Sequence, residues 1–503
     1  MPRESADTLN ISTSEAIVGI SDSTNATAEP MTDAYVGDSS SSRRHLLRLL
    51  TASVAGTLAG CAGMGDGTQT ATEPRRTSAA TTADRGSETT SPPSTTDTSE
   101  GSLEPPGSDE ARGLSVRSDG SVVRNEPPYD DDNGPVFRGI GVNYFSLFSR
   151  RIRNPGDESF RAGLQELGKH DVPFARFMAS GFWPVDWQFY REDRERYFDL
   201  LDGVVGAAEE AGVGLVPSLF WYAPTVPDVV GEPVSRLGDP DSQTISFVRT
   251  YTRELVTRYR DSPAIWGWEF GNEYNLNIDF PNPENHRFGT RTDLGQPARR
   301  GPEDDLSTAD VVTAFTEFAR EVRRNDPHRL VTTGNSAPRP TQWHQWNERT
   351  WERDTRSQFT EVLAAHHPDP VDTVSLHNYP ARTNGSTTAF QQPRFGTSVS
   401  TEEFYRATVE AASEQNRPVF LGETGLSRSA SDADGESTRE TFDRVLSAVV
   451  ESGIPLAAVW VYDAKVNRGL VEKWNVTFEN DRAYQLRALR EANDRLWSGD
   501  EPT

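Results

Sequence analysis

The sequence predicts an α/β fold, a (β/α)8 TIM barrel preceded by a signal segment and a disordered linker rich in Ser and Thr. The first observation behind this prediction is a series of eight short apolar runs. Such runs, alternating with longer amphipathic stretches, are typical of repeated β-α units and a parallel sheet. The eight runs cover residues 136–145, 172–180, 214–221, 265–273, 329–336, 371–380, 418–425 and 456–463.

The second observation is the helical pattern between these runs, with apolar residues three and four positions apart. The clearest helical stretches cover 197–212, 243–260, 309–325 and 440–453, and a last one covers 483–497. Eight strands, each followed by a helix, over about 380 residues fit a barrel with insertions. A doubly wound open sheet is the alternative, but no Gly-rich phosphate loop follows the first strand.

Two connections are longer than a barrel needs. The segment 275–306 follows the fourth strand and is rich in Pro, Asn, Arg and Gly, and the segment 381–400 follows the sixth strand. Long loops after barrel strands lie on the face where barrel enzymes bind substrate, so we expect both segments to wall a cleft.

Residues 1–60 are predicted to form a leader with an export signal. Arg43 and Arg44 precede an apolar run that ends in "LAGC" at Cys61. The run is about 15 residues long, too short to span a bilayer stably. The paired arginines resemble a twin-arginine signal, and "LAGC" resembles a lipobox whose cysteine becomes lipidated. We therefore expect an exported lipoprotein whose only membrane contact is its lipid anchor, with a chance cysteine as the alternative.

Residues 61–114 are predicted to form a disordered tether, because they are mostly Thr, Ser, Gly, Pro and acidic residues and cannot bury enough apolar surface to fold. The folded domain is expected over 115–500. Cys61 is the only cysteine, which excludes disulfides and thiolate metal sites within the chain.

The charge balance excludes nucleic acid as an expected partner, since the formal net charge is -25 and phosphate binding needs clustered basic residues. Of 51 basic residues only Lys169, Lys465 and Lys473 are lysines. This acidic, lysine-poor composition resembles that of proteins from salt-loving archaea; an ordinary acidic secreted protein is the alternative. We expect a monomer without a cofactor. We also expect no metal site, because His366 and His367 lack metal-ligand spacing.

Polar side chains lie at the ends of several predicted strands, where barrel enzymes place their reacting groups. Buried without partners they would cost a few kcal/mol, so they are expected to contact one another or a ligand. They are Arg176 in the second strand, Asn272 and Glu273 at the end of the fourth, His377, Asn378 and Tyr379 at the end of the sixth, Glu423 at the end of the seventh and Trp460 in the eighth.

Glu269 and Glu273 share one face of the fourth strand, so the alternation of side chains does not distinguish them. Position along the strand does, because Glu269 lies about 13 Å deeper at roughly 3.3 Å per residue. Glu269 is therefore expected to be held inside the barrel by partners such as Arg, and Glu273 to face the cleft as the backbone turns.

Three motifs carry a resemblance to glycoside hydrolase family 5, within the clan of retaining TIM-barrel glycosidases. They are "WEFGNE" (268–273), "HNY" (377–379) and "FLGETG" (420–425), in the order that the family requires. The resemblance implies that Glu423 is the nucleophile and Glu273 the acid/base. It implies that Asn272 bonds the sugar 2-hydroxyl and that His377 positions the sugar or the acid/base.

The same resemblance implies an electrostatic arrangement around the two glutamates. Arg176 would favour the charged form of Glu423, with Tyr379 as its hydrogen-bond partner, while partial burial and the neighbouring negative charge would raise the pKa of Glu273. Trp460 would form an apolar floor under the sugar. Trp221 and Trp183 are the better candidates among the other tryptophans for further stacking surfaces.

The expected function is that of an exported retaining hydrolase of β-1,4-linked polysaccharide. "RYRDSPAIWGWEFGNE" and "DTVSLHNYP" resemble the β-mannanase branch, so mannan is the expected substrate and endo-β-mannanase the expected type. A cellulase or other β-glucanase is the alternative within the class. A non-catalytic carbohydrate-binding envelope protein on the same scaffold is the alternative outside it. "GNEY" departs from the usual Asn-Glu-Pro, which leaves the leaving-group subsites open.

Overall fold

Eight parallel strands form one sheet in the order β7-β6-β5-β4-β3-β12-β11-β8. The computed structural model describes residues 105, 107–108, 110–130, 133–380, 391–428, 437–465 and 467–498. The strands are β3 (Gly139–Asn143), β4 (Phe174–Met178), β5 (Gly214–Phe220), β6 (Gly267–Gly271), β7 (Leu330–Thr332), β8 (Val374–His377), β11 (Val419–Thr424) and β12 (Leu456–Val459). A parallel bridge between Thr332 and Thr373 joins β7 to the segment that leads into β8, which closes the barrel. All eight predicted strands are thus confirmed.

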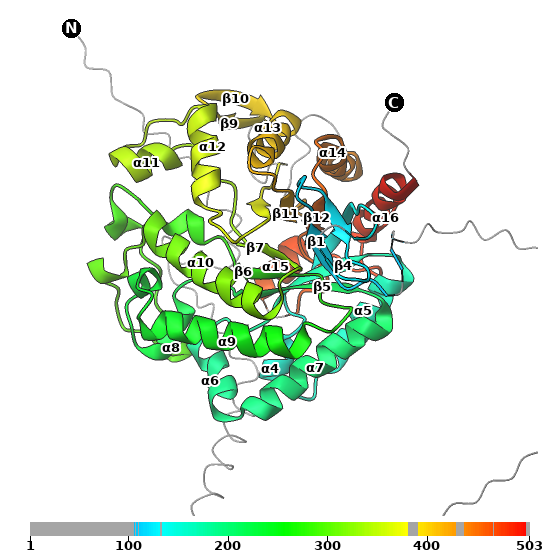
Figure 1. Cartoon of the computed structure of the whole chain (residues 1–503), viewed down its shortest axis with the longest axis horizontal. Coiled ribbons are helices and arrows are strands. Elements are labelled where there is room, and N and C mark those ends of the chain that lie inside the picture. Colours follow the sequence, from blue (N-terminus) through cyan, green and yellow to red (C-terminus); the bar gives the residue numbers. More distant parts are fainter. Residues whose placement is uncertain are drawn as a thin grey trace, which may run out of the picture. The chain divides into compact units, whose positions relative to one another are not determined.

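Helices surround the barrel and cover the outer faces of the strands (Figure 1). They are α4 (Ser149–Arg153), α5 (Ser159–Lys169), α6 (Pro184–Glu192), α7 (Arg194–Ala211), α8 (Thr225–Val230), α9 (Gln243–Tyr259), α10 (Thr308–Asn325), α11 (Gln342–Glu348), α12 (Arg356–Ala365), α13 (Thr401–Ser413), α14 (Thr438–Glu451), α15 (Arg468–Trp474) and α16 (Ala483–Ser498). The five stretches of predicted helical pattern correspond to α7, α9, α10, α14 and α16. None of the described helices is long and apolar enough to cross a membrane.

Helix α10 illustrates why these segments fold locally as they do. The Ser307 hydroxyl caps it by accepting the Asp310 N–H, while the Asp310 carboxylate accepts the Ser307 N–H in return. Its apolar face, with Phe315 and Phe318, packs against Phe270 of β6 at ring separations of 5.1 and 5.5 Å. The helix therefore clamps the strand that carries the predicted catalytic motif.

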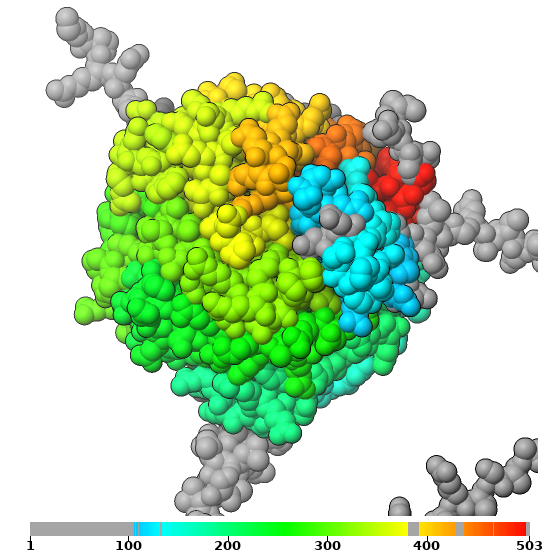
Figure 2. Space-filling model, in the orientation of Figure 1, coloured from blue at the N-terminus to red at the C-terminus, as the bar shows by residue number. Residues whose placement is uncertain are grey.

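A short antiparallel hairpin covers the amino-terminal end of the barrel. It consists of β1 (Leu114–Val116) and β2 (Val122–Arg124). The Leu114 N–H donates to the Trp266 carbonyl, and the Arg124 guanidinium lies 4.1 Å from the centroid of the Trp266 ring. Leu114 and Val122 fill an apolar cluster beneath the strands. Figure 2 shows this N-terminal segment, coloured cyan, on the face of the molecule turned toward the viewer.

The predicted tether partly overlaps this hairpin. Residues 110–114 pack on the barrel, because Ala111 is buried and Leu114 begins β1. Three-residue strands carry too little alternation to be read from sequence. The predicted leader, residues 1–60, lies outside the described residues. The same holds for residues 61–104 of the predicted tether, which include Cys61.

The segment 275–306 leaves the carboxyl end of β6 and is built from short 3-10 turns. These are η2 (Tyr274–Asn277), η3 (Pro283–Asn285), η4 (Thr292–Leu294) and η5 (Pro302–Asp304), and a further turn, η1 (Val234–Gly238), precedes α9. In the segment 381–400, residues 391–400 form the hairpin of β9 (Gln391–Arg394) and β10 (Thr397–Ser400), while 381–390 lie outside the described residues.

Candidate active site

The turn after β6 brings both Asn272 and Glu273 to the mouth of the barrel. The strand ends at Gly271, and Glu273 has a φ of 55°, a left-handed conformation that is uncommon for residues other than glycine. The Glu273 N–H donates to the Gly334 carbonyl at 2.8 Å. Gly334 is required there, since a Cβ atom would lie 1.9 Å from the Gly271 oxygen. The predicted turn of the backbone at Glu273 is confirmed.

A β-bulge directs Glu423 into the same space. Leu421 of β11 pairs with Leu376 of β8, but Glu423 pairs with His377, so β11 contains one extra residue, Gly422. Bulges of this kind bend a strand and re-aim the next side chain. A Cβ atom on Gly422 would lie 2.7 Å from His377 Nε2, so only glycine allows the imidazole to lie this close to the strand.

Arg176 of β4 joins the two glutamate-bearing strands from inside the barrel. Its Nε atom donates to both carboxylate oxygens of Glu269, at 2.8 and 3.0 Å. Its Nη1 atom donates to Glu423 Oε1 and to Asn143 Oδ1, each at 2.9 Å. Its Nη2 atom donates to Asn272 Oδ1 at 2.8 Å. The predicted contacts of Arg176 with Glu423 and of Glu269 with an arginine are both present.

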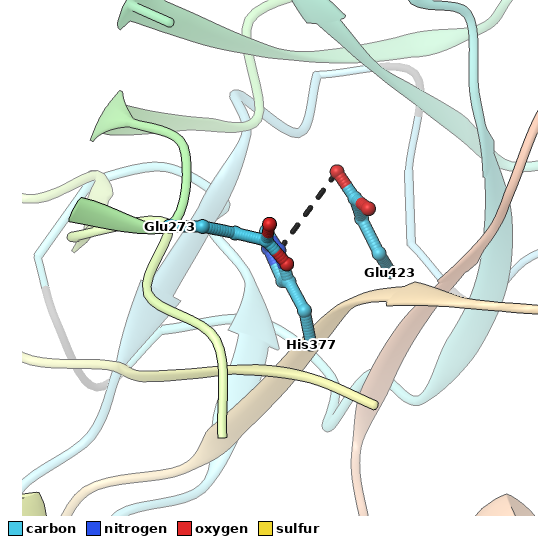
Figure 3. A group of neighbouring side chains, drawn as sticks. All are labelled: Glu273, His377 and Glu423. Carbon is cyan, nitrogen blue, oxygen red and sulfur yellow. Dashed lines mark hydrogen bonds and ion pairs between the residues drawn. The ribbon is translucent and has the colours of Figure 1, made fainter. Parts of the chain in front are cut away.

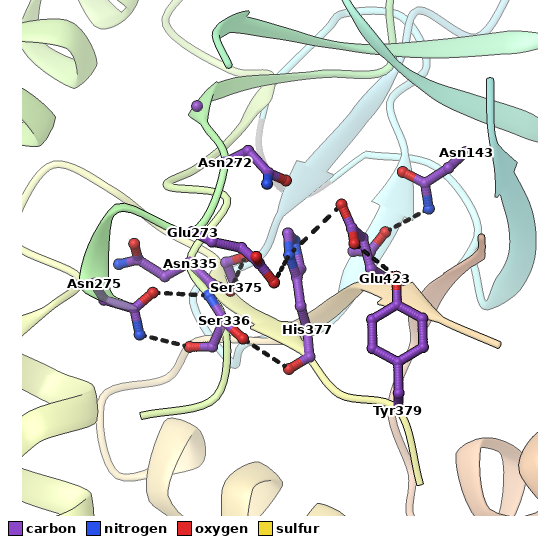
Figure 4. Close-up of polar contacts among 12 residues, drawn as sticks. Asn143, Asn272, Glu273, Asn275, Asn335, Ser336, Ser375, His377, Tyr379 and Glu423 are labelled. Carbon is purple, nitrogen blue, oxygen red and sulfur yellow. Dashed lines mark hydrogen bonds and ion pairs between the residues drawn. The ribbon is translucent and has the colours of Figure 1, made fainter. Parts of the chain in front are cut away.

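Glu273 and Glu423 face each other across His377 (Figure 3). His377 Nδ1 lies 3.2 Å from Glu273 Oε1 and 3.8 Å from Glu423 Oε1, and carboxylate oxygens of the two glutamates lie within 4.8 Å of one another. The Tyr379 hydroxyl donates to Glu423 Oε2 at 2.7 Å, as predicted (Figure 4). The two carboxyl groups can therefore act on the same bond of a bound molecule.

Burial dominates the titration of this cluster. Burial raises the pKa of Glu273 to about 7, although the Arg176 charge and a Ser336 hydrogen bond oppose it. Burial also raises the pKa of Glu423, opposed by His377, by Arg176 and by the Tyr379 hydroxyl. Burial lowers the pKa of His377 to about 4, so its imidazole is neutral at pH 7.

Arg176 favours the charged form of Glu423, as predicted. Removal of the carboxylate from water outweighs this attraction, so the net direction of the Glu423 pKa is upward. For Glu273 the predicted direction is confirmed, and burial is its main cause. Glu423 accepts two short charge-stabilising hydrogen bonds, from Arg176 and Tyr379. Of the two carboxyl groups, Glu273 is therefore the one that we expect to hold a proton.

Aromatic rings line one side of the two glutamates. Trp460 and Trp221 lie near-parallel with ring centroids 6.1 Å apart, and the Arg176 guanidinium lies 4.5 Å from the Trp221 centroid. Trp183 contacts Phe182 at 4.8 Å and belongs to the same buried aromatic cluster. Trp221 thus lies beside Arg176 of the candidate site, with Trp460 stacked near it, and Trp183 belongs to the same aromatic cluster.

Asn143, Ser336 and Trp474 are residues of the site that were missed in the sequence. Asn143 Nδ2 donates to the Gly422 carbonyl at 2.8 Å, which holds the bulge beneath Glu423 (Figure 4). It is a polar residue in the predicted strand 136–145, the same signal that identified the other strand-end residues. Trp474 of α15 lies 5.1 Å from the Tyr379 ring, and no pattern in the sequence marks it.

Two clusters of the described residues have ligand atoms close enough for a metal ion. One is Glu273, His377 and Glu423, and the other is His344, Glu348 and Glu352. In the first cluster, the Arg176 guanidinium already forms an ion pair with Glu423, and its positive charge would repel a metal cation. In the second, both glutamates are exposed. The first cluster suits acid, base and nucleophilic chemistry better than cation binding.

Comparison with known proteins gives a family match over most of the barrel. The model of the family "Cellulase (glycosyl hydrolase family 5)" matches residues 183–466. A curated relative, the probable mannan endo-1,4-beta-mannosidase C of Aspergillus terreus, is 29% identical over 225 residues, which are 43% of this chain and 47% of the relative. The chain thus spans about half the length of the curated relative that it matches.

Solved structures share the fold. The endo-1,4-beta-mannanase of Rhizomucor miehei superposes with a TM-score of 0.53 at 15% identity, over 76% of this chain and 99% of that one. The endo-beta-1,4-mannanase of Thermotoga petrophila gives a TM-score of 0.50 at 15% identity, over 74% and 79% of the two chains. At this identity the likeness concerns the fold alone.

Proposed function

The chain belongs to glycosyl hydrolase family 5, and on that premise we propose that it is a retaining glycoside hydrolase that cleaves β-1,4-linked mannan within the polymer. The observation that carries this proposal is the pair of carboxyl groups, with oxygens of Glu273 and Glu423 within 4.8 Å. Retaining enzymes need about 5 to 5.5 Å, whereas inverting enzymes leave about 6.5 to 9.5 Å for a water molecule.

In the first step, an oxygen of Glu423 attacks the anomeric carbon while Glu273 gives its proton to the glycosidic oxygen. The bond between that carbon and oxygen breaks, the leaving chain departs with the proton, and an ester joins the sugar to Glu423. Arg176 and Tyr379 hold the carboxylate of Glu423 in place for the attack. Glu273 supplies the proton because its pKa of about 7 keeps it protonated up to neutral pH.

In the second step, Glu273 acts as the base. Esterification removes the negative charge of Glu423, so an ionised Glu273 no longer faces a neighbouring carboxylate. Glu273 then takes a proton from water as the water oxygen attacks the anomeric carbon, and the ester bond to Glu423 breaks. Two inversions at one carbon retain the β configuration.

The remaining site residues bind the sugar in this proposal. The Asn272 amide, held through its oxygen by Arg176, donates from its nitrogen to the sugar 2-hydroxyl. Trp460 gives the sugar an apolar floor, with Trp221 beside it and Trp183 farther along the wall. Neutral His377 fixes the Glu273 carboxyl by a hydrogen bond at 3.2 Å.

Mannan is supported as the substrate by the similarity to the probable mannan endo-1,4-beta-mannosidase C of Aspergillus terreus. A β-glucan is the alternative. The test is the product profile on β-1,4-manno- and gluco-oligosaccharides in molar salt, with the anomer of the first product followed by NMR. Faster cleavage of manno-oligosaccharides with β product supports the proposal; an α first product refutes retention. Release from neither series favours a non-catalytic carbohydrate-binding protein.

We also propose that the protein is exported by the twin-arginine route and held on the outer side of the membrane by a lipid on Cys61. Arg43 and Arg44 before the apolar run support this, together with the "LAGC" sequence. Changing Cys61 to Ser should release the protein into the medium, with Ser91→Ala in the polar tether as the matched control. A Cys61→Ser protein that stays on the membrane contradicts the anchor.

A further inference from the structure

A cluster of aromatic rings lies outside the proposed catalytic centre, in the segment 275–306 and after α11. We propose that Phe280, His286 and Trp351 form an aromatic platform, in which Trp351 and the outer face of His286 stack against sugar units of the polysaccharide on the leaving-group side of Glu273 and Phe280 supports the His286 ring. The inference rests on the proposed function, and it names the residues that hold the polymer beyond the bond that is cleaved.

The geometry of the platform is that of a stacking surface. The Phe280 and His286 rings are parallel within 13°, with centroids 3.8 Å apart. Trp351 lies 6.0 Å from Phe280 and 6.1 Å from His286. The Trp351 side chain is 51% exposed. In the described part of the chain, it is the aromatic member of the small set of exposed large hydrophobic residues. A tryptophan held at the surface by other rings offers a flat apolar face at little entropic cost.

The platform is fixed to the backbone that follows Glu273. Arg339, in the connection after β7, donates to the Asn275 carbonyl at 3.0 Å and to the Ile278 carbonyl at 2.6 Å. The same guanidinium lies 4.3 Å from the centroid of the Phe280 ring. Arg339 is buried, so it locks the start of the segment 275–306 and supports the platform from beneath.

The position of Glu273 sets the direction in which the polymer leaves. The proton donor, Glu273, lies beside the glycosidic oxygen, and this oxygen departs with the leaving chain. The loop that carries Phe280 and His286 begins directly after Glu273 and is held by Arg339. A polymer that extends past Glu273 on this side therefore reaches the loops after β6 and β7, where the platform lies.

A hollow beside the platform has the polar groups that sugar hydroxyls require. It is narrow, with room for little more than a group the size of a water molecule, and is lined by Phe280, His286 and Phe288 together with Asp304 and other residues. Arg287 and Asp305 form a two-bonded ion pair on its wall, at 2.6 and 2.9 Å. Aromatic faces with a few convergent polar groups suit a neutral sugar, whereas the carboxylates would repel an anionic polymer.

The state of His286 fits a neutral ligand. Burial and the Arg339 charge lower the pKa of His286, so the ring stacked on Phe280 carries no charge at neutral pH. A neutral imidazole costs less to cover with a sugar than a charged one.

The experiment compares two substrates in Trp351→Ala and in wild type. One is an aryl β-mannobioside, whose leaving group is a single aryl ring too short to reach Trp351, and the other is soluble galactomannan. A stacking contact worth the usual aromatic increment predicts a rise in KM for galactomannan of roughly 2- to 12-fold, with kcat/KM for the aryl substrate unchanged. Trp351→Phe should restore most of the affinity. Val136→Ala, at an equally exposed apolar residue, is the surface control.

Retardation in native gels that contain galactomannan separates this inference from the proposed function. An active wild type whose KM for galactomannan does not respond to Trp351→Ala refutes the platform and leaves hydrolysis standing. An inactive wild type whose retardation depends on Trp351 refutes hydrolysis and supports the platform. Two outcomes overturn the platform. One is a loss of activity in Trp351→Ala that is equal on both substrates. The other is a wild type whose migration galactomannan does not retard and whose rate does not saturate with galactomannan.

Discussion

Replacing Glu273 with Gln should stabilise the folded protein at pH 8 and change its stability little at pH 5. Burial raises the pKa of Glu273 from its ordinary value of 4.5 to about 7, so the folded protein binds this proton more tightly than the unfolded chain does. As pH rises from 4.5 to 7, the unfolded chain loses the proton first, and the free energy of unfolding falls. A pKa difference of about 2.5 corresponds to about 3 kcal/mol above pH 7.

Glutamine has the same shape but cannot ionise, so it removes this penalty. The assay is urea unfolding followed by tryptophan fluorescence, in molar salt, at pH 5, 6, 7 and 8. Comparison of the two proteins at each pH cancels the other titrating groups. Glu192→Gln, at an exposed position at the end of α6, is the control and should show no such trend. A stability difference that stays constant, or that shrinks as pH rises, would refute the account of Glu273.

Three further outcomes follow from the same site. The kcat/KM value should fall as pH rises through about 7, because Glu273 must be protonated to act as the acid; a pH profile that stays flat to pH 9 contradicts this role. Glu423→Ala should lose nearly all activity, and azide should restore turnover only by forming a sugar azide of inverted configuration; near-wild-type activity means that another residue is the nucleophile. Tyr379→Phe removes the 2.7 Å hydrogen bond to Glu423 and should lower kcat about 10-fold at unchanged KM, whereas a change in KM alone would make Tyr379 a sugar-binding residue.

The strands and the residues at their ends could be predicted because barrel strands are covered on both faces. Such strands read as unbroken apolar runs, and a polar residue within one stands out. This signal identifies Arg176, Glu273, His377 and Glu423, and it would have identified Asn143 as well. The order of the motifs along the chain then gives the order of the strands.

The finer features of the site depend on contacts between distant segments. The bulge at Gly422 exists only relative to the pairing of β11 with β8. The left-handed turn at Glu273 depends on the Gly334 carbonyl, which lies on another connection. The direction of the Glu423 pKa shift requires the extent of burial to be weighed against the Arg176 charge. Trp351 lies in a stretch without periodicity, so the sequence does not show that its ring is exposed.

The hairpin of β1 and β2 determines where a mechanical load would enter the barrel. The Leu114 N–H bonds the Trp266 carbonyl at the amino-terminal end of β6, whereas Glu273 follows the opposite end of that strand. A pull on the chain before residue 110 would load the hairpin and spare the loops around the two glutamates. If the proposed anchor exists, the chain that leads to it joins the barrel at the end opposite Glu273 and Glu423, so the tether does not start beside the loops that would bind the polymer.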